Sequence, residues 1–133
     1  MRFDRLQATR WLTLIMGIIT VLTGLALVFA PEWFFVHIGY YPPFNRHYEG
    51  DLGMFNLGIG AGLILAWRDP RRHRLMIGAA ALGNVLHVLN HIYDSIISRA
   101  TLAHWVSDGG PVLIGAVALV LAWWWAEPVD AAG

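Results

Sequence analysis

The sequence predicts an all-α integral membrane protein, a bundle of four transmembrane helices with both termini in the cytoplasm. Three observations lead to this fold class. Of the 133 residues, 57% are hydrophobic, which is more than a soluble domain usually contains. Charged residues make up only 14% of the chain, and they gather between long apolar runs. The arginines are also divided unequally among the segments that connect these runs.

Four apolar runs approach the length of about 20 residues that a helix needs to cross a bilayer. The expected spans are about 11–30, 50–67, 75–94 and 103–126, in a single domain of residues 1–133. The first run exceeds the signal-peptide core of about 7–15 residues, so we expect a retained helix. The second run is the shortest, and it needs Gly50 and Asp51, or a thinner bilayer, to cross.

The connections differ in length and character. The segment 31–49 is rich in aromatic residues and contains Pro42-Pro43, which interrupts any helix. We expect it to form an extracytoplasmic loop that lies in the membrane interface and covers the bundle. Asp69-Pro70 predicts a tight turn between the second and third spans.

The arginines set the orientation. Seven of the nine precede the first span or fill the turn between the second and third, and only Arg46 and Arg99 lie on the other side. Because cytoplasmic loops carry an excess of basic residues, this turn and both termini are predicted to be cytoplasmic. All nine basic residues are arginine, and alanine and glycine are abundant, which suggests a GC-rich bacterial genome. The predicted location is therefore a bacterial inner or plasma membrane, crossed several times.

Small residues recur at helical spacing in the second and third spans. Gly58, Gly62 and Ala66 form one row, and Ala79 and Gly83 form another. Such rows let helix backbones approach closely in lipid. We expect them to be packing faces within the bundle, with a homo-oligomer interface as the alternative.

Polar residues of the spans gather in the predicted outer half of the membrane. The third span carries Asn84, His87, His91 and Asp94 at spacings of three, four and three, which places them on one helical stripe. An ionisable group inside a membrane costs several kcal/mol at mid-depth and usually faces a partner or a cavity. The predicted topology brings further polar residues to the same level: His47, Glu49, Asp51, Asn56, His104 and Asp108.

This layer predicts a metal site. His87 and His91 form an HxxxH pair that presents two imidazoles on one helix face, and Asp51 or Asp108 would complete the shell of a divalent ion. Two histidines, a carboxylate and an open position suit zinc or non-haem iron. Glu49 is then the candidate acid or base for a bound water. The remaining polar residues are expected to orient the ligands or contact a bound molecule: Asn84, Asp94, His47, His104 and Asn56.

Other cofactors are disfavoured. The chain has no cysteine, which excludes Fe–S clusters and Cys-ligated zinc. Haem is disfavoured because His87 and His91 share one helix and cannot occupy opposite faces of one macrocycle. A net charge of zero gives no indication of a nucleic-acid partner, so the lipid bilayer is the predicted surrounding.

Two alternatives stay open. In the first, the polar side chains form a hydrogen-bonded network between helices, in a non-catalytic accessory or scaffold subunit of a larger membrane complex. Asp51 and Asp108 would then cap helices, and Asp94 would face water. In the second, the aromatic segment closes a pocket that binds or transports a lipid, a quinone or another small apolar molecule. Whether the protein is an enzyme is left open by the sequence.

The layout resembles the small four-helix bacterial membrane proteins of the DoxX-like families and related families of unknown function. The segments that carry the resemblance are GDLGMFNLGIGAGLILAW, RDPRRHR and GNVLHVLNHIYD. The resemblance implies a four-helix bundle and, in some members, a link to redox enzymes. It assigns no catalytic residue to this chain, so the site is predicted from the residues alone.

Overall fold

The computed structural model describes residues 4–126, and that range consists of helices and their connections without a strand. The all-α prediction is therefore confirmed. Arg2 and the two chain ends, which the topology prediction places in the cytoplasm, lie outside the described residues. In chain order the helices are α1 (Arg5–Phe29), α2 (Pro31–His37), α3 (Arg46–Ala66), α4 (Arg74–Ile97), α5 (Leu102–His104), the π-helical turn η1 (Trp105–Gly109) and α6 (Gly110–Trp125).

Three helical stretches are long and apolar enough to cross a membrane. They are α1, α4 and the continuous stretch Leu102–Trp125, which comprises α5, η1 and α6. Helix α3 has 21 residues but is not among them, because Glu49 and Asp51 make its first turns polar. The chain therefore has the helices of a membrane protein, while the fourth span stays a prediction.

Side-chain caps determine where two of the helices begin. Asp4 Oδ1 accepts hydrogen bonds from two backbone N–H groups of the first turn of α1, at 3.0 and 3.1 Å. Asn45 Oδ1 does the same for α3, at 3.1 and 3.2 Å. Such caps stabilise a helix by about 1 kcal/mol. Both helices therefore begin before the apolar runs at Trp11 and Gly50 that mark the predicted spans.

Helices α1 and α3 pack against each other through glycines, and we call this pair the α1–α3 arm. A Cβ atom on Gly17 or Gly24 would lie 2.8–2.9 Å from backbone atoms of α3, and one on Gly53 or Gly60 would lie 2.8–3.0 Å from backbone atoms of α1. These distances leave no room for a side chain. The two backbones are therefore in direct contact at two places, where Gly17 faces Gly60 and where Gly24 faces Gly53.

The packing rows predicted from the sequence are partly wrong. A Cβ atom on Gly58 or Gly83 would meet nothing within 4 Å, so neither glycine lies at a helix contact of the described chain. Gly62 does face another helix, because a Cβ there would meet the side chain of Met76. The face of α3 that packs on α1 is the one with Gly53 and Gly60, because these glycines lie opposite glycines of α1.

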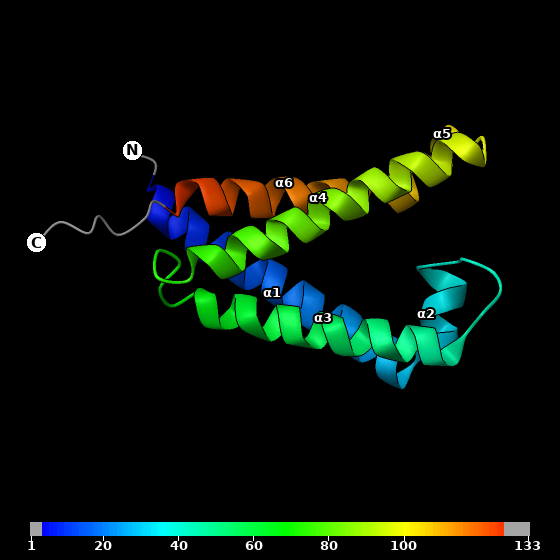
Figure 1. Ribbon diagram of the computed structural model, residues 1–133, viewed down its shortest axis with the longest axis horizontal. Helices are drawn as coiled ribbons and strands as arrows, with labels where there is room; N and C mark the ends of the chain where they lie inside the picture. The colour runs from blue at the N-terminus through cyan, green and yellow to red at the C-terminus, as the bar shows by residue number, and fades with distance from the viewer. Residues whose placement is uncertain (1–3, 127–133) are drawn as a thin grey trace, which may run out of the picture.

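The apolar core lies at the end of the molecule that bears the turn between α3 and α4 (Figure 1). We call it the arginine end, since Arg5, Arg10 and Arg74 begin helices there or lie in their first turns. The guanidinium of Arg74 lies 4.4 Å from the ring centroid of Trp123, a cation–π contact that joins α4 to α6. The core is formed by Leu63, Ala66, Ile77, Ala80, Ala81, Leu119, Ala122 and Ala126.

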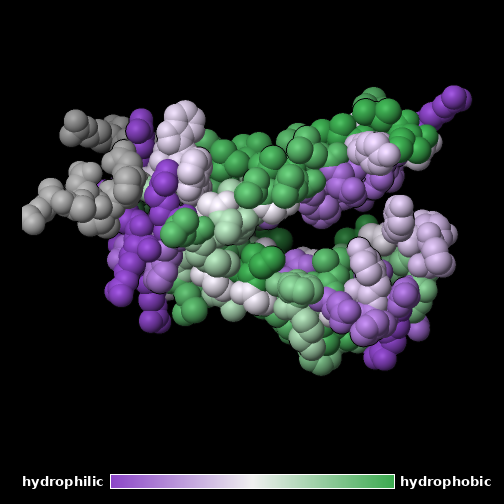
Figure 2. Space-filling model, viewed as in Figure 1, coloured by the Kyte–Doolittle hydropathy of each residue, from purple (hydrophilic) through white to green (hydrophobic). Residues whose placement is uncertain are grey.

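The helices diverge toward the opposite end, which we call the histidine end. There the α1–α3 arm separates from a second pair, α4 with α6 and η1, which we call the α4–α6 arm (Figure 1). Figure 2 shows the surface hollowed between the two arms, with hydrophilic side chains on the side of the α4–α6 arm that faces the hollow. The molecule thus has a cleft with a polar wall on that arm.

The segment 31–49 contains more structure than an irregular loop. It includes α2, and the ring of Phe35 contacts Tyr40 and Phe44 at centroid distances of 5.1 and 5.2 Å. The Pro42-Pro43 peptide bond is cis. It lies outside any helix, as the sequence predicts.

Candidate functional site

The predicted polar stripe lies on α4, but its members have different neighbours. Asn84 donates a hydrogen bond to the carbonyl of Ala80 at 3.0 Å, and its Oδ1 lies beside Gly115 of α6. Asp94, at the outer end, accepts a hydrogen bond from Asn90 at 2.9 Å. These two residues bond within their own helix. The polar contact to another helix is made by His91, which lies between them.

His87 and His91 lie one turn apart, and their imidazole rings touch. The ring centroids are 4.7 Å apart, and the two Nε2 atoms are 3.0 Å apart. The HxxxH spacing thus brings two ring nitrogens together on one face of α4, as the sequence predicts. His87 is the more exposed residue of the two.

Asp108 connects this pair to the next helix. Its Oδ2 lies 2.8 Å from Nδ1 of His91 and 3.5 Å from Nε2 of His104. The side chains of His91 and Asp108 are 23% and 29% exposed, which shields their contact from much of the solvent. The four side chains form a continuous row from His104 through Asp108 and His91 to His87.

A π-helical turn positions Asp108. Pro111 has no backbone N–H to donate, and in a regular α-helix its ring would clash with the carbonyl of Ser107. The helix is widened in the preceding turn, η1, which contains Asp108 and packs against α4. Turns of this kind are frequent at functional sites. The alternative in which Asp108 caps the last span is wrong, because α6 has no side-chain cap.

The geometry favours His91 as an oriented ligand. Its Nδ1–H donates to the carboxylate of Asp108, which leaves the lone pair of the neutral ring on Nε2, beside His87. Histidines that bind metals commonly donate their other ring N–H to a carboxylate in this way. Asp108 is therefore better suited to orient His91 than to serve as a direct ligand.

The spacing of the two Nε2 atoms is close to that in a metal shell. Two nitrogens bound to tetrahedral zinc at about 2.0–2.1 Å lie about 3.3–3.4 Å apart. The observed 3.0 Å requires only a small rotation of the rings. Among residues 4–126, no group of three or more His, Cys, Asp or Glu side chains is arranged to hold a metal ion. Further ligands would come from water or from a bound molecule in the cleft.

The remaining predicted site residues lie on the α1–α3 arm, and none makes a hydrogen bond or ion pair with these histidines. His47 and Asp51 pair with each other at 3.5 Å, with side chains that are 89% and 61% exposed. Asn45, rather than Asp51, caps α3. Asn56 donates to the carbonyl of Leu52 at 2.8 Å.

Glu49 also belongs to the other arm. It is 8% exposed and shares the buried face of α3 with Gly53, the face that packs on α1. It lies before the predicted span 50–67, and burial raises the pKa of its carboxyl above the ordinary value. Its position gives no support to a role as acid or base at the histidine pair.

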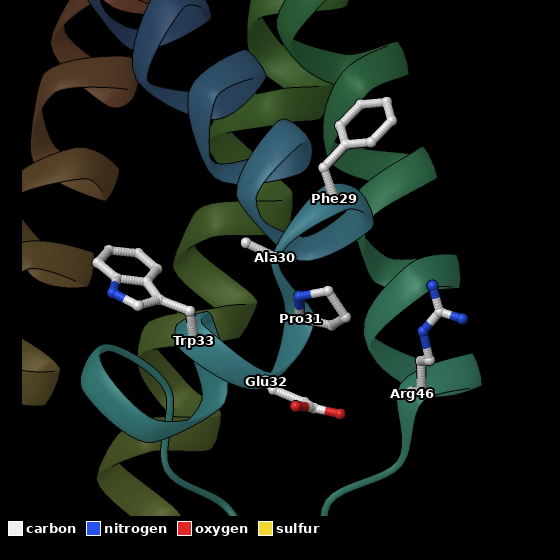
Figure 3. A pocket seen from close by; sticks show the side chains of 6 residues that line it. All are labelled: Phe29, Ala30, Pro31, Glu32, Trp33 and Arg46. Atoms are coloured by element: carbon white, nitrogen blue, oxygen red, sulfur yellow. The ribbon is translucent and has the colours of Figure 1, made fainter.

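One feature of the histidine end was not expected from the sequence. A shallow pocket of about 330 Å³ lies where α1 meets α2, close to the start of α3 (Figure 3). Its lining includes an acid, Glu32, and a base, Arg46, from different helices. The sequence gives no local signal of this pair, because the two residues are far apart in the chain and Arg46 only contributes to the predicted orientation.

Comparisons with protein families, with curated proteins and with solved structures give no match to this chain. The resemblance to the DoxX-like families stays a prediction from the layout. The function is therefore argued from the geometry of the site.

Proposed function

We propose that this protein is a four-span bacterial inner-membrane or plasma-membrane protein that binds a divalent metal ion, zinc or iron, through His87 and His91. In this proposal residues 50–67, which include most of α3, form the fourth span, both termini are cytoplasmic, and the histidine end is extracytoplasmic. The ion would lie on the wall of the cleft between the two arms. Two positions of its shell would be open to water or to a small or lipid-like molecule that enters from the outer leaflet.

The observation that carries the proposal is the position of His91. One of its ring nitrogens lies 3.0 Å from Nε2 of His87, and the other lies 2.8 Å from the carboxylate of Asp108. In the contact between the two histidines, one Nε2 atom must carry a hydrogen, and a metal ion would replace it. Asp108 would hold the ring in place and increase the basicity of the ligating nitrogen.

The test is elemental analysis of the detergent-purified protein after incubation with zinc or iron(II) and removal of free metal. We expect about one ion per chain for the wild type. A His87→Ala/His91→Ala variant should lose the ion, because both proposed ligands are removed. Circular dichroism and the elution volume show whether the variant is still folded. A folded double variant that retains the full metal content would contradict the proposal.

A matched control uses the histidine–carboxylate pair of the α1–α3 arm, His47 and Asp51. His47 and Asp51 stand at the same spacing of four residues, but they are exposed and lie on the other arm. A His47→Ala/Asp51→Asn variant removes one imidazole and one carboxylate without touching the proposed site. We expect it to keep its metal, whereas metal loss here would mean that His47 or Asp51 is a ligand.

A second candidate function is a structural polar network in a non-catalytic accessory subunit. The row from His104 to His87 favours it, because Asp108 already joins α4 to η1 without a metal ion. Under this alternative, the His87→Ala/His91→Ala variant would unfold at a lower temperature, while neither it nor the wild type would bind metal above the background of the buffer.

A further inference from the structure

The pocket at Glu32 and Arg46 carries an inference that is independent of the histidine site. It is lined by Phe29, Ala30, Pro31, Glu32, Trp33 and Arg46. Phe29 is the last residue of α1, one of the three helices suited to cross a membrane. The pocket therefore lies where a spanning α1 would leave the hydrocarbon, at the level of the lipid headgroups.

The two charges of the pocket are not neutralised by the protein. Among residues 4–126, neither Glu32 nor Arg46 has an ion-pair partner within 4.0 Å, and both side chains are exposed. Figure 3 shows both side chains beside the ring of Pro31, with Glu32 below the ring and Arg46 to its right. A ligand that bridges them needs an anionic group for Arg46 and a cationic group for Glu32.

Two apolar residues of the pocket, Phe29 and Pro31, differ in exposure. Phe29 is 79% exposed and lies at the upper edge of the pocket in Figure 3, on the side of the membrane-spanning part of α1. Pro31 also lines the pocket but is buried. A ligand with a zwitterionic head and an apolar tail would place the tail along Phe29 and the outer face of α1.

We propose that this pocket binds a phospholipid with a primary ammonium in its headgroup, a phosphoethanolamine lipid, through the juxtaposed charges of Arg46 and Glu32. The phosphodiester lies on Arg46, whose planar guanidinium suits a phosphate. The ammonium lies on Glu32 and donates N–H hydrogen bonds to the carboxylate. The volume of about 330 Å³ fits a headgroup rather than a whole lipid.

Other headgroups match the pocket less well. A phosphoglycerol lipid offers the phosphate but leaves Glu32 without a cation. A choline headgroup has no N–H to donate, and its recognition usually relies on aromatic faces around the ammonium. In Figure 3 the indole of Trp33 points away from Glu32 and Arg46, so it forms no such cage.

The test is native mass spectrometry of the full chain released from nanodiscs that contain equal amounts of phosphoethanolamine, phosphocholine and phosphoglycerol lipids. We expect the wild type to retain the phosphoethanolamine lipid about two- to fivefold over the other two, the ratio that an exposed ion pair supplies. Glu32→Gln should remove this preference without removing the bound phospholipid. Arg46→Gln should lower retention of all three lipids, and Arg46→Lys, which keeps the charge, should restore part of it.

Arg99→Gln is the matched control, since Arg99 is an exposed arginine at the end of α4 and lies outside the pocket. It should leave lipid retention unchanged. Equal retention of the three lipids by the wild type, or an unchanged preference in Glu32→Gln, would overturn the proposal. So would an equal loss in Arg99→Gln and Arg46→Gln.

A second experiment distinguishes a lipid from a soluble ligand. Glycerophosphoethanolamine has the same head but no chains to lie along Phe29, so it should displace the retained lipid only weakly. Complete displacement at equal concentration would overturn the assignment to a lipid. None of these outcomes depends on the metal content of the histidine pair.

Discussion

The two arms of the molecule are held together in different ways. In the α1–α3 arm, glycines bring the two helix backbones into contact at two places. In the α4–α6 arm, apolar packing is concentrated near the arginine end, and the outer part is joined by His91 and Asp108. Direct backbone contact holds α1 and α3 together at two places. In the other arm, the contact between His91 and Asp108 is partly exposed to solvent and could be reached by a ligand. The row of His104, Asp108, His91 and His87 lies on the arm that glycine contacts do not hold together.

The largest expected effect comes from breaking the glycine contact. A Cβ atom on Gly60 would lie 2.8 Å from the backbone nitrogen of Val21 and 2.9 Å from the carbonyl oxygen of Gly17. Because these are backbone atoms, Gly60→Leu must push the two helices apart. Overpacking of this kind costs about 1–3 kcal/mol or more. We expect thermal unfolding in detergent, followed by circular dichroism, to shift to a clearly lower temperature.

Gly58→Leu is the control for that variant. It makes the same substitution on the same helix, at a position where a Cβ atom meets nothing within 4 Å. Its unfolding temperature should stay close to that of the wild type. If both variants are equally destabilised, Gly58 lies at a contact outside this chain, and the homo-oligomer interface predicted from the small-residue rows gains support.

The polar contact of the other arm is tested by Asp108→Asn. The amide oxygen of asparagine can still accept the Nδ1–H of His91, but it carries no charge. If Asp108 orients a metal ligand, zinc affinity should fall about 10–100-fold, the usual result of removing such a partner. A competition titration against a coloured zinc chelator measures this change. A complete loss of binding, as in the variant without both histidines, would make Asp108 a direct ligand.

The difference between the arms also explains which features the sequence could predict. Helices follow from apolar runs and caps, so the all-α class and the polar stripe from Asn84 to Asp94 could be recognised locally. The HxxxH spacing predicts the contact of His87 and His91 because an α-helix places those residues one turn apart. These are properties of single helices.

Properties that depend on how the arms pack could not be predicted in the same way. Asp51 and Asp108 are equivalent candidates in the sequence, but only Asp108 reaches His91, because the arms diverge at the histidine end. Glu49 lies on the packed face of α3, and its burial depends on α1. A local signal did exist for the π-helical turn, since Pro111 follows two glycines, but it indicates an irregular helix without giving the direction of Asp108.

The smallest expected effect concerns the one buried carboxylate of the glycine-packed arm. Burial raises the pKa of Glu49, so the folded protein keeps this proton to a higher pH than the unfolded chain, whose carboxyl titrates near 4.5. Stability from this group is therefore fully present below pH 4.5 and is lost as the pH rises through the folded pKa. We expect Glu49→Gln to remove this decline, so that the variant unfolds at a higher temperature than the wild type at neutral pH.

Unfolding temperatures measured between pH 4 and pH 8 provide the check, and Glu32→Gln controls for the loss of one negative charge at the same end. A wild-type profile that rises over this window while the Glu49→Gln profile is flat would mean that the Glu49 carboxylate is stabilised in its charged form by α1 or α2, and the close packing of this arm would then extend to a polar contact as well.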